Sequence, residues 1–179
     1  MKKLVLILFL LATSMEAFSQ NTITFLGIPV TGTKREMGAK LQGKGFVYDS
    51  YSDLYYGEFN GQDVKISIQT VNNRVWRIGI MDAYTTDRNN ISIRYNKLFD
   101  QFLNNGKYYL GSGQKLTDYD IQNLEYHVKY ANERHDAVFY PKNSSINGRV
   151  WYMIGYEALS YRIFMYYENN DNAANGDDL

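Results

Sequence analysis

The sequence contains no cysteine. It therefore has no disulfide framework, no thiolate nucleophile and no thiolate metal site. It also lacks an excess of charge of either sign, because 19 Lys and Arg residues balance 19 Asp and Glu residues. This balance argues against nucleic-acid binding and against polybasic membrane docking, which both need a basic surface. Only two prolines and 45% hydrophobic residues argue against a disordered chain.

The first residues have the pattern of an export signal. Lys2 and Lys3 precede an unbroken apolar run, which is followed by the small-residue site Ala17-Phe18-Ser19. This order predicts a secretory signal peptide over residues 1–19, cleaved before Gln20. The run is far shorter than the roughly 20 residues of a membrane-spanning helix, and no later run is longer. We expect an exported protein with no integral membrane span in its mature chain, in the periplasm or outside the cell.

The first half of the mature chain predicts one helix and a meander of strands. Thr33 and Glu36 form a capping box that starts a helix over residues 34–43. Asn60-Gly61 is a strong hairpin signal between two runs of strand-forming residues. Apolar and polar residues then alternate, as expected for strands with one buried face. The predicted strands are 46–48, 54–59, 64–69 and 76–80.

The second half predicts a longer helix followed by more strands. Ile91, Tyr95 and Leu98 are at helical spacing and predict a helix over about 90–105. Residues 121–133 fit either a helix or a strand, and their many polar residues favour the helix. The remaining predicted elements are strands at 108–110, 137–140, 149–156 and 160–168 and a flexible tail at 169–179.

These elements define an α+β fold. The sequence predicts a single α+β domain over residues 20–168, with two or three helices on one face of an antiparallel meandering sheet of about seven or eight strands. Arg74-Val75-Trp76 recurs as Arg149-Val150-Trp151. This echo raises the hypothesis of two related halves, 23–88 and 89–168.

Several short motifs carry a resemblance. They are Gly27-Ile28-Pro29-Val30, Gly32-Thr33, Met37, Leu41, Lys44-Gly45-Phe46, Arg149-Val150-Trp151 and Tyr166-Tyr167-Glu168-Asn169. With them the chain resembles uncharacterised exported proteins of Gram-negative bacteria. The resemblance implies a fold similar to that of the β-lactamase-inhibitor protein, called BLIP-like, with helices packed on an antiparallel sheet. It implies no catalytic residue and no inhibition of β-lactamase.

Residues for catalysis or metal binding are scarce. His127 and His135 are the two histidines of the chain, and their spacing matches no metal motif. We interpret them as solvated or locally hydrogen-bonded side chains. The sequence therefore predicts no catalytic residue, no metal and no cofactor. A hydrolase with a site near these histidines and Asp118 remains an alternative.

Aromatic residues are abundant, with 17 Tyr, 9 Phe and 2 Trp. If Trp76 and Ile78 face the helices, Arg77 faces away from them. By the echo, Trp151 would face the helices and Tyr152 would face outward. One sheet face would then combine cationic and large aromatic side chains, as interface hot spots do. Its predicted residues are Lys65, Gln69, Arg77, Tyr152, Tyr156, Arg162, Phe164 and Tyr166.

This pattern predicts a non-catalytic recognition module whose sheet face binds a protein, a peptide or a glycan. Tyrosine also favours strands without any ligand, so the aromatic surplus has a structural explanation too. A self-associating structural protein of the cell envelope is a further alternative. Neither the ligand nor the oligomeric state follows from the sequence.

Overall fold

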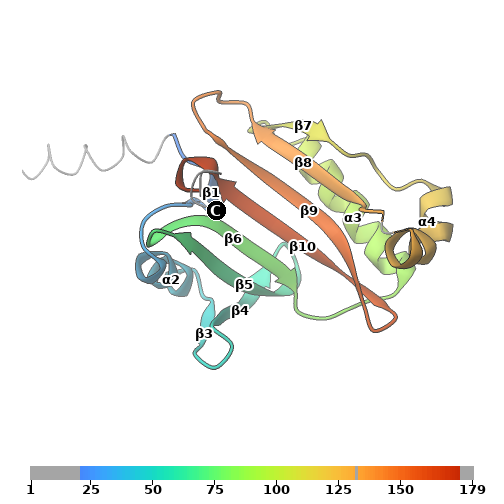
Figure 1. Ribbon diagram of the computed structural model, residues 1–179, viewed down its shortest axis with the longest axis horizontal. Helices are drawn as coiled ribbons and strands as arrows, with labels where there is room; N and C mark the ends of the chain where they lie inside the picture. The colour runs from blue at the N-terminus through green and yellow to red at the C-terminus, as the bar shows by residue number, and fades with distance from the viewer. Residues whose placement is uncertain (1–20, 132, 174–179) are drawn as a thin grey trace, which may run out of the picture.

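A computed structural model describes residues 21–131 and 133–173 of the chain (Figure 1). The predicted signal peptide at 1–19 lies outside these described residues. Within them, no helix is long and apolar enough to cross a membrane.

Eight antiparallel strands form the central sheet, which confirms the predicted α+β class. The strand order is β3-β4-β5-β6-β10-β9-β8-β7, so the last strands of two successive meanders pair at the centre. The strands are β3 (Val47–Asp49), β4 (Leu54–Phe59), β5 (Gln62–Val71), β6 (Arg74–Asp82), β7 (Tyr108–Ser112), β8 (Asp136–Pro141), β9 (Gly148–Glu157) and β10 (Ser160–Asn169). A separate two-stranded sheet pairs β1 (Thr24–Phe25) with β2 (Ile28–Pro29).

Three α-helices pack against the sheet. They are α2 (Lys34–Gly43), α3 (Arg88–Leu103) and α4 (Asp118–Glu125). The capping box of Thr33 and Glu36 starts α2, as the sequence predicted. The ambiguous segment is helical over residues 121–130, since α4 continues into a π-helical turn, η1 (Tyr126–Tyr130).

The core lies between the sheet and the helices α2 and α3. One row of buried side chains, aligned by strand pairing, crosses the sheet from β4 to β8: Tyr55, Ile66, Ile80, Met165, Tyr152 and Ala137. Helix α2 meets this row where Gly38 lies against the ring of Tyr55. Helix α3 meets it where the ring of Tyr95 packs edge-on against Tyr152. The row therefore defines which face of the sheet the helices cover.

Two glycines of α2 provide a test of this packing. A methyl group at Gly38 would overlap the hydroxyl and ring of Tyr55, whereas one at Gly43 would meet no atom within 4 Å. We expect Gly38→Ala to be less stable than Gly43→Ala by about 1–3 kcal/mol in thermal or urea unfolding, because it overfills the contact between α2 and the sheet. Gly43→Ala is the control for the change in helix propensity. Equal stability of the two variants would contradict this helix–sheet contact.

The segment after β10 differs from the predicted tail. Asn169 is buried and donates a side-chain hydrogen bond to the carbonyl of Val30 at 2.9 Å. Residues Asn170–Asn172 form a short 3-10 helix, η2, and Asn172 donates to the carbonyl of Val75. The prediction of a free tail is therefore wrong for residues 169–173, because these amide side chains satisfy backbone groups near the N-terminal strands. Residues 174–179 lie outside the described residues.

The Arg-Val-Trp echo does not match the arrangement of strands. Its first copy begins β6, the fourth strand of the first meander, and its second copy begins β9, the third strand of the second. Strands β6 and β10, not β6 and β9, hold equivalent places in the two meanders. The echo therefore aligns strands that do not correspond, and the relation between the two halves stays a prediction.

Candidate functional site

The sheet face opposite α2 and α3 carries large polar and aromatic side chains, and we call it the open face. Strand pairing places these residues on it: Tyr56, Lys65, Gln69, Arg77, Arg149, Trp151, Met153, Arg162, Phe164 and Tyr166. In Figure 1, β6, β10 and β9 run across the view, and α3 is drawn behind β8 on the right. Most of these side chains are half-buried because they pack against one another.

Six of the eight predicted site residues are on the open face. The predictions for Tyr152 and Tyr156 are wrong, because both side chains lie on the helix-covered face. Tyr152 is fully buried, and its hydroxyl donates to the carbonyl of Tyr95 at 3.2 Å. The ring of Tyr156 packs on buried Tyr161, and its hydroxyl donates to Glu125 at 3.4 Å.

A β-bulge explains this error. Gln69 pairs with Arg77, but the next residue of β5, Thr70, pairs with Val75, so Trp76 is an extra residue in β6. Val75 and Ile78 are both buried, although strict alternation would place them on opposite faces. The assumed inward orientation of Trp76 was therefore wrong. Because Arg149-Val150-Trp151 was assigned the same orientation as Arg74-Val75-Trp76, Trp151 was also expected to face the helices. In the structure it lies on the open face.

A stack of aromatic rings and guanidinium groups crosses the centre of the open face. The guanidinium of Arg77 lies 3.9 Å from the ring centre of Trp76 and 5.2 Å from that of Tyr166. Tyr166 stacks on Trp151 with ring centres 4.3 Å apart. The guanidinium of Arg134 lies 5.8 Å from the ring of Trp151. Cation–π and stacking contacts thus join side chains from β6, β10, β9 and the segment before β8.

A buried carboxylate holds this stack in place. Glu168 is 1% exposed and lies opposite Arg77 on one neighbouring strand and Arg149 on the other. Its oxygens accept hydrogen bonds from Trp151 Nε1 at 2.7 Å and from Arg149 Nε at 2.5 Å, and Arg77 pairs with it at 2.6 Å. Such charge-assisted bonds fix the planes of both guanidinium groups.

The other end of the open face is more apolar. Arg162 pairs with the exposed carboxylate of Glu157 at 2.7 Å. The ring of Phe164 lies so close to Gly155 that any side chain there would overlap it. The open face is thus dominated by rings and guanidinium groups, with Lys65, Gln69 and Met153 among them.

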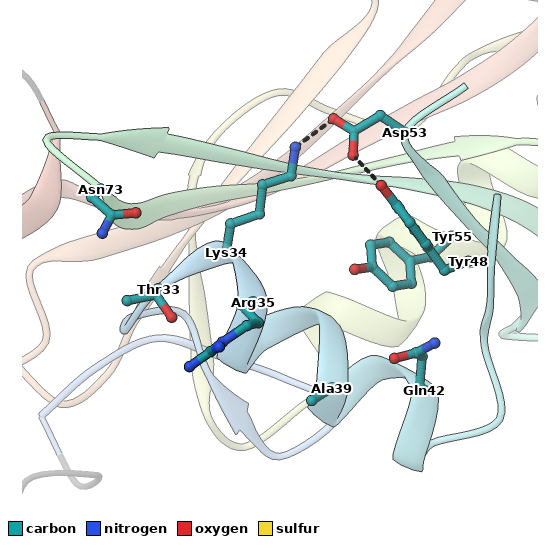
Figure 2. Close-up of a pocket in the computed structure, with 9 residues that line it drawn as sticks. All are labelled: Thr33, Lys34, Arg35, Ala39, Gln42, Tyr48, Asp53, Tyr55 and Asn73. Carbon is teal, nitrogen blue, oxygen red and sulfur yellow. Dashed lines mark hydrogen bonds and ion pairs between the residues drawn. The ribbon is translucent and has the colours of Figure 1, made fainter. Parts of the chain in front are cut away.

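A groove of about 750 Å³ lies elsewhere, between α2 and the turn from β3 to β4 (Figure 2). Figure 2 shows Lys34 and Tyr48 both directed at Asp53. Tyr48 donates to Asp53 at 3.0 Å, and Lys34 forms an ion pair with it. Hydrogen bonds from Lys34 and Tyr48 hold the pKa of Asp53 below its usual value. Lys34 and Asp53 therefore satisfy each other's charge, which favours a structural role for this pair in holding α2 against the turn.

The structure brings the two histidines together. Nδ1 of His127 lies 3.2 Å from Nε2 of His135, and the carboxylate beside them is that of Asp120, not the predicted Asp118. Burial lowers the pKa of His135, and the proximity of His127 lowers it further. Among the described residues, the polar side-chain contacts of the two rings involve each other and Glu133, not a serine or threonine hydroxyl. These contacts supply no nucleophile for the hydrolase alternative.

Comparison of the chain with protein-family models, curated proteins and solved structures gives no match. The resemblance to exported BLIP-like proteins therefore stays a prediction from the sequence motifs.

Proposed function

We propose that this protein is an exported, non-catalytic binding module that recognises another protein through the open face of its sheet. Export is supported by the signal-peptide pattern of residues 1–19. Recognition is supported by the concentration of arginine and aromatic side chains on a sheet face that no helix of the described residues covers.

The stack at the centre of the open face favours a protein over a glycan as the ligand, and this observation carries the proposal. A sugar ring binds an aromatic side chain by lying on a free ring face. Tyr166 has Arg77 on one side and Trp151 on the other, and Trp151 lies between Tyr166 and Arg134. Both rings therefore have neighbouring groups against them, which leaves less free ring face for a sugar. Ring edges and fixed guanidinium groups suit the mixed apolar and carboxylate surface of a protein.

Site-specific photo-crosslinking tests this proposal. A benzophenone side chain is introduced at Phe164 on the open face or at Ile93, which is 66% exposed on α3. We expect irradiation in envelope extract to give a discrete adduct with a second protein from position 164 and none from position 93. A sugar-containing adduct, or equal labelling from both positions, would contradict the proposed site. An adduct of two copies of this chain would favour the self-associating alternative instead.

A substitution on the open face provides a second test of the proposed function. Arg162→Gln removes a guanidinium from the open face but leaves the Glu168 network intact. We expect it to reduce the yield of the 164 adduct by about tenfold under conditions where thermal unfolding shows the variant to be folded, since a hot-spot arginine contributes 1 kcal/mol or more, at least ~5-fold, to binding. Arg35→Gln, an exposed residue of α2, is the control. Undiminished labelling in Arg162→Gln would show that this arginine does not contact the partner.

A further inference from the structure

The histidine pair has a geometry that its sequence spacing did not indicate. Ligand atoms of Asp120, His127 and His135 all lie within 4.8 Å of one another. The two imidazole rings stack with centres 5.3 Å apart, and His127 is buried. These three side chains come from α4, from the π-helical turn η1 and from the segment before β8. Three segments that are separate along the chain therefore bring these side chains together.

The distance between the two nitrogens suits metal coordination. In a tetrahedral site with metal–nitrogen bonds of about 2.0–2.1 Å, two ligating nitrogens are about 3.3 Å apart. Nδ1 of His127 and Nε2 of His135 are separated by 3.2 Å. The separation of the two nitrogens is therefore compatible with one shared divalent ion. An oxygen of Asp120 lies within 4.8 Å of both nitrogens, close enough to belong to the same cluster.

Backbone contacts hold the three side chains in position. The Thr117–Asp120 capping box fixes the first turn of α4 and uses Oδ2 of Asp120, with the Thr117 N–H at 2.8 Å. The backbone N–H of Glu133 donates to the carbonyl of His127 at 2.9 Å. The backbone N–H of Ile154 donates to the carbonyl of His135 at 3.1 Å. The π-helical turn itself is a rare conformation that occurs often at functional sites. The site is therefore largely preorganised.

The surrounding charges favour a cation. The carboxylate of Asp120 belongs to the cluster, and that of Glu133 lies beside the ring of His127. The neighbouring cations are engaged elsewhere, since Lys129 pairs with Glu125 and Arg134 stacks on Trp151. Glu133 lies 3.6 Å from Nδ1 of His127, at the border of the cluster, where a carboxylate or a water completes a fourth ligand position.

We propose that Asp120, His127 and His135 form a binding site for one divalent transition-metal ion of the zinc type. Imidazole and carboxylate ligands suit Zn²⁺, Ni²⁺ and Cu²⁺ rather than Mg²⁺ or Ca²⁺, which prefer oxygen ligands alone. The ion joins the α4–η1 segment to the start of β8. This site replaces the expectation from the sequence that the chain carries no metal site, because the fold brings together groups that the spacing kept apart.

Calorimetric titration with Zn²⁺ tests the site in the purified chain without a polyhistidine tag. We expect one ion per chain, no binding in the double variant His127→Gln/His135→Gln, and affinity reduced by about tenfold or more in Asp120→Asn. Glu125→Gln is the matched control, because it removes a carboxylate from the same helix that lies outside the cluster. Equal binding by the wild type and the double variant, or no binding by the wild type, would overturn the proposal.

A second measurement needs no substitution, so it holds even if the variants fail to fold. The chain has two histidines, so its proton NMR spectrum contains two sets of imidazole signals. We expect one equivalent of Zn²⁺ to shift both sets together, and Co²⁺ to produce the visible absorption of a tetrahedral site. A shift of only one set, or of neither, would show that the two rings do not share an ion.

Discussion

Glu168→Gln is expected to lower the free energy of unfolding by about 3 kcal/mol, with 5 kcal/mol as the upper range for breaking a buried ion pair. Glu168 is 1% exposed and accepts hydrogen bonds from Arg149 and Trp151 while pairing with Arg77. The amide of glutamine is neutral and has one acceptor oxygen, so it leaves both guanidinium groups without a counter-charge. Arg77 and Arg149 are themselves partly exposed, which favours the lower end of this range.

Urea unfolding measures this loss, and the same open face provides a matched control. Glu157→Gln also removes a carboxylate that pairs with an arginine, but the side chain of Glu157 is 63% exposed. Because Glu157 is exposed, solvent screens its charge, so this control should lose clearly less stability than Glu168→Gln although its partner Arg162 is only 12% exposed. If the two variants lost equal stability, the carboxylate of Glu168 would not be the buried anchor of the open face.

Tyr152→Ala is expected to lower the free energy of unfolding by about 3–5 kcal/mol, because it leaves a cavity in the core. The ring of Tyr152 is fully buried and packs edge-on against Tyr95 and in stacked geometry against Phe102 and Phe139. Burial raises the pKa of this tyrosine, so its hydroxyl stays protonated and donates to the carbonyl of Tyr95.

Tyr152→Phe separates packing from hydrogen bonding at the same position. It keeps the ring and removes one hydrogen bond, so a loss of about 1 kcal/mol is expected. Thermal unfolding of both variants distinguishes the structure from the outward orientation that the sequence predicted. A Tyr152→Ala variant as stable as the wild type would support the outward orientation and contradict the core described here.

Local patterns predicted the helices and hairpins well because their causes are short-range. The residues Thr33 and Glu36 satisfy backbone groups at the start of α2, so its observed bounds match the predicted ones. Asn60-Gly61 adopts positive φ angles at both residues, which suits a tight hairpin turn between β4 and β5. Each of these signals acts within four residues, so no tertiary contact is needed to interpret it.

The orientation of side chains on the central strands could be predicted only in part. Alternation was enough to place Lys65, Arg77 and Tyr166 on one face. It failed for Tyr152. The extra residue Trp76 changes which side chains of β6 face the helices, and the repeated Arg-Val-Trp motif was used to assign the same orientation to β9. A bulge is selected by pairing with the neighbouring strand, and this pairing is not visible in the bulged strand alone.

The sequence by itself determined the absence of thiol chemistry, the charge balance, the α+β class and the position of most helices and strands, since each depends on composition or on neighbours along the chain. The tertiary structure alone decided on which face Trp151 and Tyr152 lie, how Glu168 anchors two arginines, and that Asp120 lies beside the two histidines. Those features arise from pairing between strands and packing between segments that are distant in the sequence, and such contacts leave no periodic signal in it.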